Sequence, residues 1–68
     1  MIYTFIPAKF SPVALEKVEL DFKAGIKTMY YQSGSPPHSH PCAPKITLKM
    51  MRTLVEAGTW LELRPTKV

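Results

Sequence analysis

The chain has one cysteine, Cys42, among its 68 residues. A single thiol cannot form an intramolecular disulfide, and a chain this short buries only about 60% of its unfolded surface. Small domains of this size usually gain stability from disulfides, a metal or a partner chain. We therefore expect a supplement from metal or self-association, with a homodimer favoured, and a reducing, cytoplasmic setting for the thiol.

Long apolar runs are also missing. No stretch approaches the roughly 18 apolar residues that span a bilayer. The N-terminal sequence MIYTFIPAKF has no positive region ahead of its short apolar run, and Pro7 interrupts that run, which is not the pattern of a signal peptide. The prediction is a soluble, unprocessed protein with no membrane partner, forming one small domain over residues 1–68.

The groups that usually carry catalysis are scarce. Asp21 is the only aspartate, no pair of carboxylates has a spacing suited to acid–base work, and no glycine-rich phosphate loop is present. Cys42 near His40 could pair as nucleophile and base, but a proline-rich loop rarely holds such a pair rigidly. We predict no catalytic residues, with RNase activity through the two histidines as a minor alternative.

The net charge of +4 is unevenly distributed. Residues 1–32 hold four lysines against three acidic residues, whereas residues 33–68 hold five basic residues against two acidic ones. This distribution favours a polyanionic partner for the second half of the chain, RNA or DNA first.

The first half of the chain predicts strands. Residues 2–6 are β-prone and end at Pro7. Residues 12–24 allow two interpretations: Ser11-Pro12 could begin a helix, but strict alternation of apolar and charged residues from 17 to 23 favours a strand. Residues 23–25 then form a turn, and residues 26–32 return as the second arm of a hairpin.

The second half begins with a proline-rich segment at residues 33–44, SGSPPHSHPCAP, which we predict to be an extended connector, partly polyproline II. Residues 46–48 predict a short strand, residues 49–57 a helix that stops at Gly58, and residues 59–64 another strand. The expected fold is α+β: a small antiparallel sheet with an N-terminal β-hairpin, the connector, and a strand–helix–strand unit.

The helix predicted from residue 49 has a wide apolar half, which suggests burial against a second protomer as well as the sheet. That half holds Leu48, Met50, Met51, Leu54, Val55 and Ala57. The basic residues gather on the other half. With two tyrosines they form a candidate nucleic-acid surface for phosphate contact and base stacking, namely Lys45, Lys49, Arg52, Arg64, Tyr30 and Tyr31. The alternative is that these residues form a solvated helix face without a ligand, on which Arg52 pairs with Glu56.

Two further sets of residues are candidates for binding. Trp60, Met50 and Met51 would anchor a protein partner, as in the small interaction modules, of phage or mobile-element type, that bind and inhibit or redirect a host enzyme. Three potential metal ligands stand at alternate positions, His38, His40 and Cys42. In an extended segment they would share one side and could bind zinc or copper, although a closed zinc site needs a fourth ligand.

Residues 30–58 contain, in order, an aromatic–Gln–Ser segment, a proline-containing connector and the run PKITLKMMRTLVEAG. This order resembles the core of the bacterial SymE-type toxins. The matching positions are Ile46, Thr47, Leu48, Lys49, Leu54, Glu56, Ala57 and Gly58. The resemblance implies a relation to the AbrB/MazE swapped-hairpin fold, a strand at residues 46–49, dimerisation, and a toxin-like role in translation inhibition and RNA cleavage.

Overall fold

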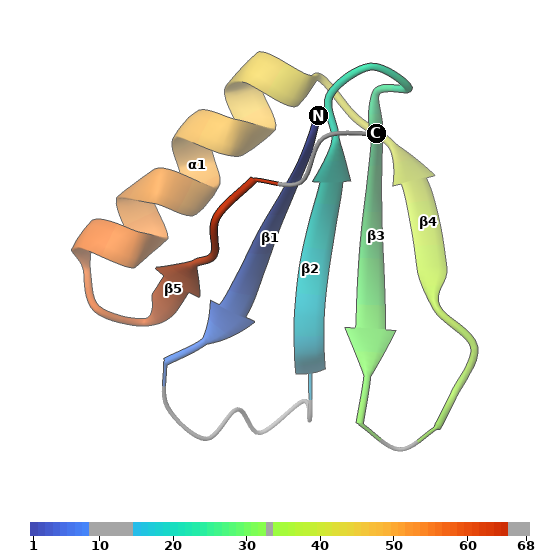
Figure 1. The fold of residues 1–68 in the computed structure, drawn as a ribbon, viewed down its shortest axis with the longest axis horizontal. Helices are drawn as coiled ribbons and strands as arrows, with labels where there is room; N and C mark the ends of the chain where they lie inside the picture. Colours follow the sequence, from blue (N-terminus) through green and yellow to red (C-terminus); the bar gives the residue numbers. More distant parts are fainter. Residues whose placement is uncertain (9–14, 33, 66–68) are drawn as a thin grey trace.

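A computed structural model describes residues 1–8, 15–32 and 34–65. These residues form five strands and one helix, with the helix on one face of the sheet (Figure 1). Their bounds are β1 Ile2–Pro7, β2 Leu15–Asp21, β3 Ile26–Tyr31, β4 His38–Pro41, α1 Pro44–Glu56 and β5 Trp60–Glu62. The strands are antiparallel in the order β4-β3-β2-β1-β5. The predicted α+β class is confirmed.

The hairpin of β2 and β3 confirms the strand interpretation of residues 15–21, where apolar and charged residues alternate. The proposed helix start at residues 11–12 lies outside the described residues. The turn between the strands is tight. The Asp21 carboxylate accepts a hydrogen bond from the Ala24 N–H at 3.0 Å, and Gly25 adopts a φ of 67°, a conformation that favours glycine.

The core lies between α1 and one face of the sheet. Because side chains alternate across a strand, Phe5 of β1 and its cross-strand partner Val18 of β2 project to the same face. Leu20 follows two residues after Val18 on that face, and Met51 reaches it from α1. These four are the buried hydrophobic residues among those described, with Phe5 and Leu20 fully enclosed. We call this side of the sheet the helix face.

Strand β4 corrects the prediction that residues 33–44 form only an extended connector. His38–Pro41 pairs with β3, and the Thr28 and Ser39 hydroxyls hydrogen-bond across the two strands at 2.9 Å. The Cys42 N–H donates to the Gly25 carbonyl at 2.9 Å, so by antiparallel alternation Ser39 and Pro41 turn their backbone groups outward. Pro41 therefore costs the ladder no hydrogen bond, because its missing N–H would have pointed to solvent.

Residues 46–48 are helical, so the predicted strand there is wrong. Helix α1 begins at Pro44, after the extended Ala43. Proline suits the first turn of a helix because its fixed φ fits and its missing N–H had no partner to lose. The Thr47 N–H already donates to the Ala43 carbonyl at 2.9 Å. Three β-prone residues are too few to oppose the helix-forming run that follows them.

The predicted stop at Gly58 is confirmed, and so is the strand after it. Gly58 has a φ of 83°. Its N–H donates to the Val55 carbonyl at 3.0 Å, and the Thr59 N–H donates to the Leu54 carbonyl at 3.1 Å. This is the Schellman pattern of a helix end. The chain then turns directly into β5, which pairs with β1 at one edge of the sheet.

Candidate interaction surface on helix α1

Helix α1 presents three different strips along its length. One faces the sheet and includes Met51, which is buried, with Leu48 and Val55 half-buried. The second is cationic and the third is apolar and exposed. At 100° per residue the three strips divide the circumference of the helix between them.

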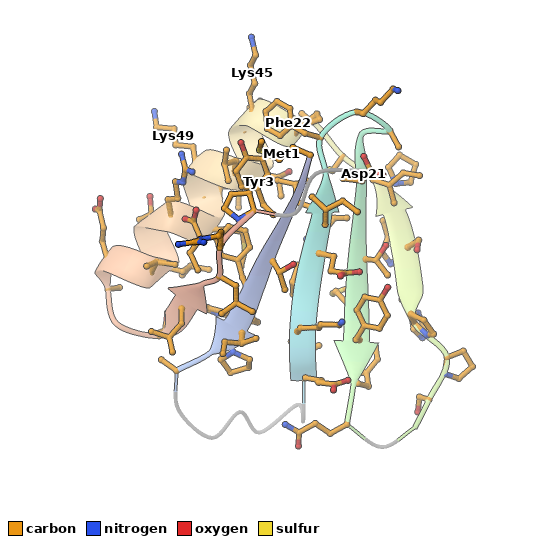
Figure 2. The ribbon with its side chains drawn as sticks, in the orientation of Figure 1. Met1, Tyr3, Asp21, Phe22, Lys45 and Lys49 are labelled. Atoms are coloured by element: carbon orange, nitrogen blue, oxygen red, sulfur yellow. The ribbon has the colours of Figure 1, made fainter. Side chains whose placement is uncertain are left out.

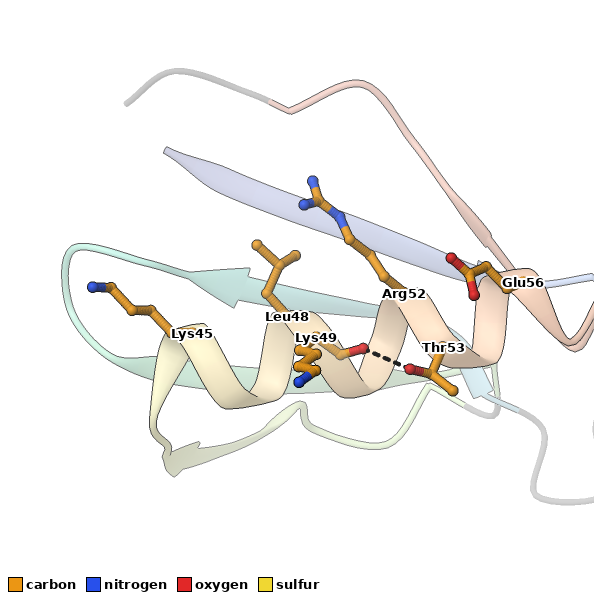
Figure 3. A pocket seen from close by; sticks show the side chains of 6 residues that line it. All are labelled: Lys45, Leu48, Lys49, Arg52, Thr53 and Glu56. Atoms are coloured by element: carbon orange, nitrogen blue, oxygen red, sulfur yellow. Dashed lines mark hydrogen bonds between the residues drawn. The ribbon is translucent and has the colours of Figure 1, made fainter.

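The cationic strip brings together three of the six residues predicted for nucleic-acid contact. Lys45, Lys49 and Arg52 line a shallow pocket of about 410 Å³ on the helix surface, together with Leu48, Thr53 and Glu56 (Figure 3). Lys45 and Lys49 both extend away from the sheet (Figure 2), and both residues are exposed.

Arg52 differs from the two lysines because it already has a carboxylate partner. Its Nε and Nη2 atoms donate to the two carboxylate oxygens of Glu62 in β5 at 3.1 and 3.2 Å. The pKa of Arg52 is raised by this hydrogen bonding and by the charge of Glu62. Its guanidinium also lies 5.7 Å from the centre of the Tyr3 ring. The predicted alternative partner, Glu56, is therefore replaced by Glu62.

The two predicted stacking residues lie on opposite faces of the sheet, because adjacent residues of a strand point in opposite directions. Tyr30 pairs with Lys17, away from the helix face. The Lys17 ammonium lies 4.7 Å from the centre of the Tyr30 ring. The Tyr30 hydroxyl hydrogen-bonds Glu19, which raises the pKa of Tyr30. Tyr31 is on the helix face, its ring edge-on to His38 at 5.4 Å. The tyrosines therefore do not form one platform beside the lysines.

Of the remaining predicted residues, Arg64 is exposed just beyond β5 and Trp60 is half-buried within it. Met51 lies in the core, whereas its neighbour Met50 is 64% exposed. One methionine of the predicted partner-binding pair is therefore available at the surface and the other is not.

The exposed apolar strip was not foreseen as a unit. It consists of Ile46 and Met50, each 64% exposed, and Leu54, 39% exposed. The three residues are spaced by four, so they follow one another along a single side of α1. Sequence reasoning missed the strip because it placed Ile46 in a strand. Starting the helix at Pro44 would have revealed the spacing.

The three predicted metal ligands do not come together. His38 and His40 share one side of β4, with ring centres 6.5 Å apart. Cys42 lies beyond the end of the strand and is half-buried. Within residues 1–8, 15–32 and 34–65, no three His, Cys, Asp or Glu side chains are grouped so that they could hold a metal ion.

No family model, curated protein or solved structure matches the chain. The resemblance to SymE-type toxins therefore stays a prediction, and the strand it implies at residues 46–49 is part of α1. Among the described residues there is no helix of the length and apolar character needed to cross a bilayer.

Proposed function

We propose that this protein is a small interaction module that lays α1 into an apolar groove of a partner protein. The observation that supports it is the exposed strip of Ile46, Met50 and Leu54 beside Lys45 and Lys49. Amphipathic helices that bind grooves use anchors at such helical spacings.

The apolar strip points away from the core between α1 and the sheet. The core-facing side of α1 is already occupied by Met51 against the sheet, so Ile46 and Met50 point elsewhere. Single exposed apolar residues are common on protein surfaces, but a continuous row on one helix is typical of an interaction site. Methionine suits such a site because its flexible side chain adapts to an irregular groove.

The charges next to the strip indicate the chemistry of the partner. Lys45 and Lys49 flank it, and Glu56 is the only acidic residue of α1, while Arg52 is compensated by Glu62. The groove that receives this helix should therefore carry carboxylates along one rim. Complementary rim charges would speed association and fix the direction of the helix in the groove.

Nucleic-acid binding by a regulator or toxin-like protein is the second candidate, favoured by the gathering of Lys45, Lys49 and Arg52 on one strip. It is less well supported, because Arg52 is paired and the two tyrosines lie on opposite faces. A helix entering a nucleic-acid groove would also place Ile46 and Met50 next to phosphates.

The test is a pull-down from bacterial lysate with the tagged chain, divided into nuclease-treated and untreated halves. Ile46→Ser with Met50→Ser removes the strip, and Lys45→Glu with Lys49→Glu reverses the flanking charge. The matched controls are Leu61→Ser with Leu63→Ser, which removes two exposed leucines in and just after β5 (49% and 43% exposed), and Lys23→Glu with Lys27→Glu, which makes the same charge change on the β2–β3 hairpin.

The proposal expects one protein retained after nuclease at near-stoichiometric amounts, lost with the strip variant and weakened by salt and by the flank variant. Both control variants should retain it. Release of all bound material by nuclease would favour the nucleic-acid candidate instead. A self-association that only the strip variant abolishes, seen by sedimentation, would make a second copy the occupant and overturn the proposed partner.

A further inference from the structure

We propose that His38 and His40 bind a copper ion, with the thioether of Met29 as a third ligand, on the part of the helix face that α1 leaves open. This site is separate from the helix surface and does not depend on the proposed function. Cys42, which the sequence grouped with the histidines, is not a ligand of it.

Strand β4 holds the two imidazoles in a chelating arrangement. Residues two apart in a strand project to the same side, and the rings of His38 and His40 lie 6.5 Å apart with an angle of 30° between their planes. With metal–nitrogen bonds of about 2.0–2.1 Å, two imidazoles on one ion have ring centres about 5–6.5 Å apart. The rings therefore need only a small rotation to share an ion.

The neighbouring strand fixes the base of this arrangement. The ladder between β3 and β4 pairs residues 26–29 with residues 38–41, and the Thr28–Ser39 hydroxyl contact ties the same two strands together on the opposite face. The ring of Tyr31 meets His38 edge-on, which limits the orientations open to that imidazole. Both histidines are exposed, so an ion can reach them directly from solvent.

Met29 supplies the feature that selects the metal. It stands directly opposite His38 in the ladder, on the same face of the sheet, and is half-buried. Directly opposed residues have Cβ atoms about 4.5–5.5 Å apart, which brings the Met29 sulfur within reach of an ion on His38. Thioether with imidazole is a ligand set that favours copper, especially Cu⁺, over zinc or the harder cations.

Among the described residues of the β3–β4 ladder, Lys27 is the charged one, and it pairs with His40. Its positive charge disfavours a bound cation on that side, so the ion is expected nearer to His38 and Met29.

The experiment is an anaerobic titration of the full chain with Cu⁺ against a chromophoric competing chelator, in the wild type and in Cys42→Ser. His38 and His40 are the only histidines, so His38→Ala and His40→Ala test every imidazole. Met29→Leu preserves volume and removes the sulfur. Circular dichroism of each variant checks that the fold is intact, and Zn²⁺ serves as the contrasting ion.

The expected result is one Cu⁺ per chain, unchanged by Cys42→Ser and weakened about tenfold or more by either histidine variant. Met29→Leu should weaken Cu⁺ while leaving Zn²⁺ within about twofold, and Cu⁺ should shift the Met29 methyl resonance. Loss of binding in Cys42→Ser, or wild-type affinity in either histidine variant, would overturn the site. An unaffected Met29→Leu would remove copper selectivity and leave a plain imidazole pair.

Discussion

The two halves of the sheet differ in what covers them. On the helix face, α1 packs against β5 and β2, and the buried residues Phe5, Val18 and Leu20 come from β1 and β2. Strands β3 and β4 have no buried residue along their whole length and carry the histidines instead. Figure 1 shows the same division, with the helix on the β1 and β5 side and β4 at the far edge. The buried side chains that stabilise the sheet are therefore concentrated in β1 and β2, and β3 and β4 can carry exposed polar side chains.

The largest expected effect breaks the covered half. Phe5→Ala should cost about 3–5 kcal/mol, because it leaves a cavity at a fully enclosed position. A small domain has only about 5 kcal/mol or somewhat more in total, so little of the free energy of unfolding would remain. Urea denaturation followed by circular dichroism measures this. Met29→Ala in the open half is the control and should cost clearly less. Equal losses at the two sites would mean that the halves share one core.

Adjacent methionines of α1 test the same contrast within one helix. Met51 is 8% exposed and Met50 64% exposed, so Met51→Ala should cost about 2 kcal/mol or more. Met50→Ala should change the free energy of unfolding by no more than about 0.5 kcal/mol. Chemical denaturation of the two variants side by side is sufficient. A comparable loss at Met50 would show that its side chain is covered in solution.

The junction between α1 and β5 should respond to Gly58→Ala. The φ of 83° is strained for a residue with a Cβ, whereas nothing lies within 4 Å of the added atom. The cost is therefore conformational and should be about 1 kcal/mol, seen as a lower midpoint in urea with an unchanged slope. A variant as stable as the wild type would imply that the helix ends differently in solution.

The smallest effect concerns Tyr30, on the face opposite α1. Its pKa is raised above the usual value, first by the hydrogen bond to Glu19 and then by burial and the charge of Glu19. The fold thus favours the neutral hydroxyl, so this contribution to stability is complete below about pH 10 and is lost as the pH rises through the raised pKa. Titration of tyrosinate absorbance should show one tyrosine ionising earlier in Glu19→Gln. An identical curve would contradict the contact.

Local chemistry explains which elements could be predicted from the sequence. The alternation around Val18 and Leu20 specifies a strand because one face must be buried, and Gly25 and Gly58 mark turns because their backbone conformations exclude most other residues. The predicted hairpin is therefore confirmed, although β2 ends at Asp21 and the turn begins at residue 22, earlier than the alternation to residue 23 indicated.

The missed elements depend on partners that are distant in sequence. A proline such as Pro41 argues against a strand unless the strand is known to have a paired strand on one side only. This is the case for β4, which lies at the edge of the sheet next to β3. In the same way, whether Tyr30 and Tyr31 flank the basic strip depends on which face α1 covers. The helical periodicity from residue 49 identified Met50 and Leu54 as apolar residues of one helix half. That Ile46 continues their row could be predicted only with the helix start at Pro44.

Pro41 has a further consequence for how copies of this chain could assemble. Pro41 points away from β3 but has no N–H. Ser39 is then the one residue of β4 that offers an N–H to a further strand, so this edge is a poor template for strand pairing. At the opposite edge, Trp60 and Glu62 turn both backbone groups outward, as the Leu63–Thr4 and Ala8–Thr59 hydrogen bonds imply. If only the β5 edge can pair with another strand, two copies of the sheet can join only through their β5 edges. Strand pairing would then stop at a closed two-fold pair, and the head-to-tail stacking that builds fibres would have no second site to use.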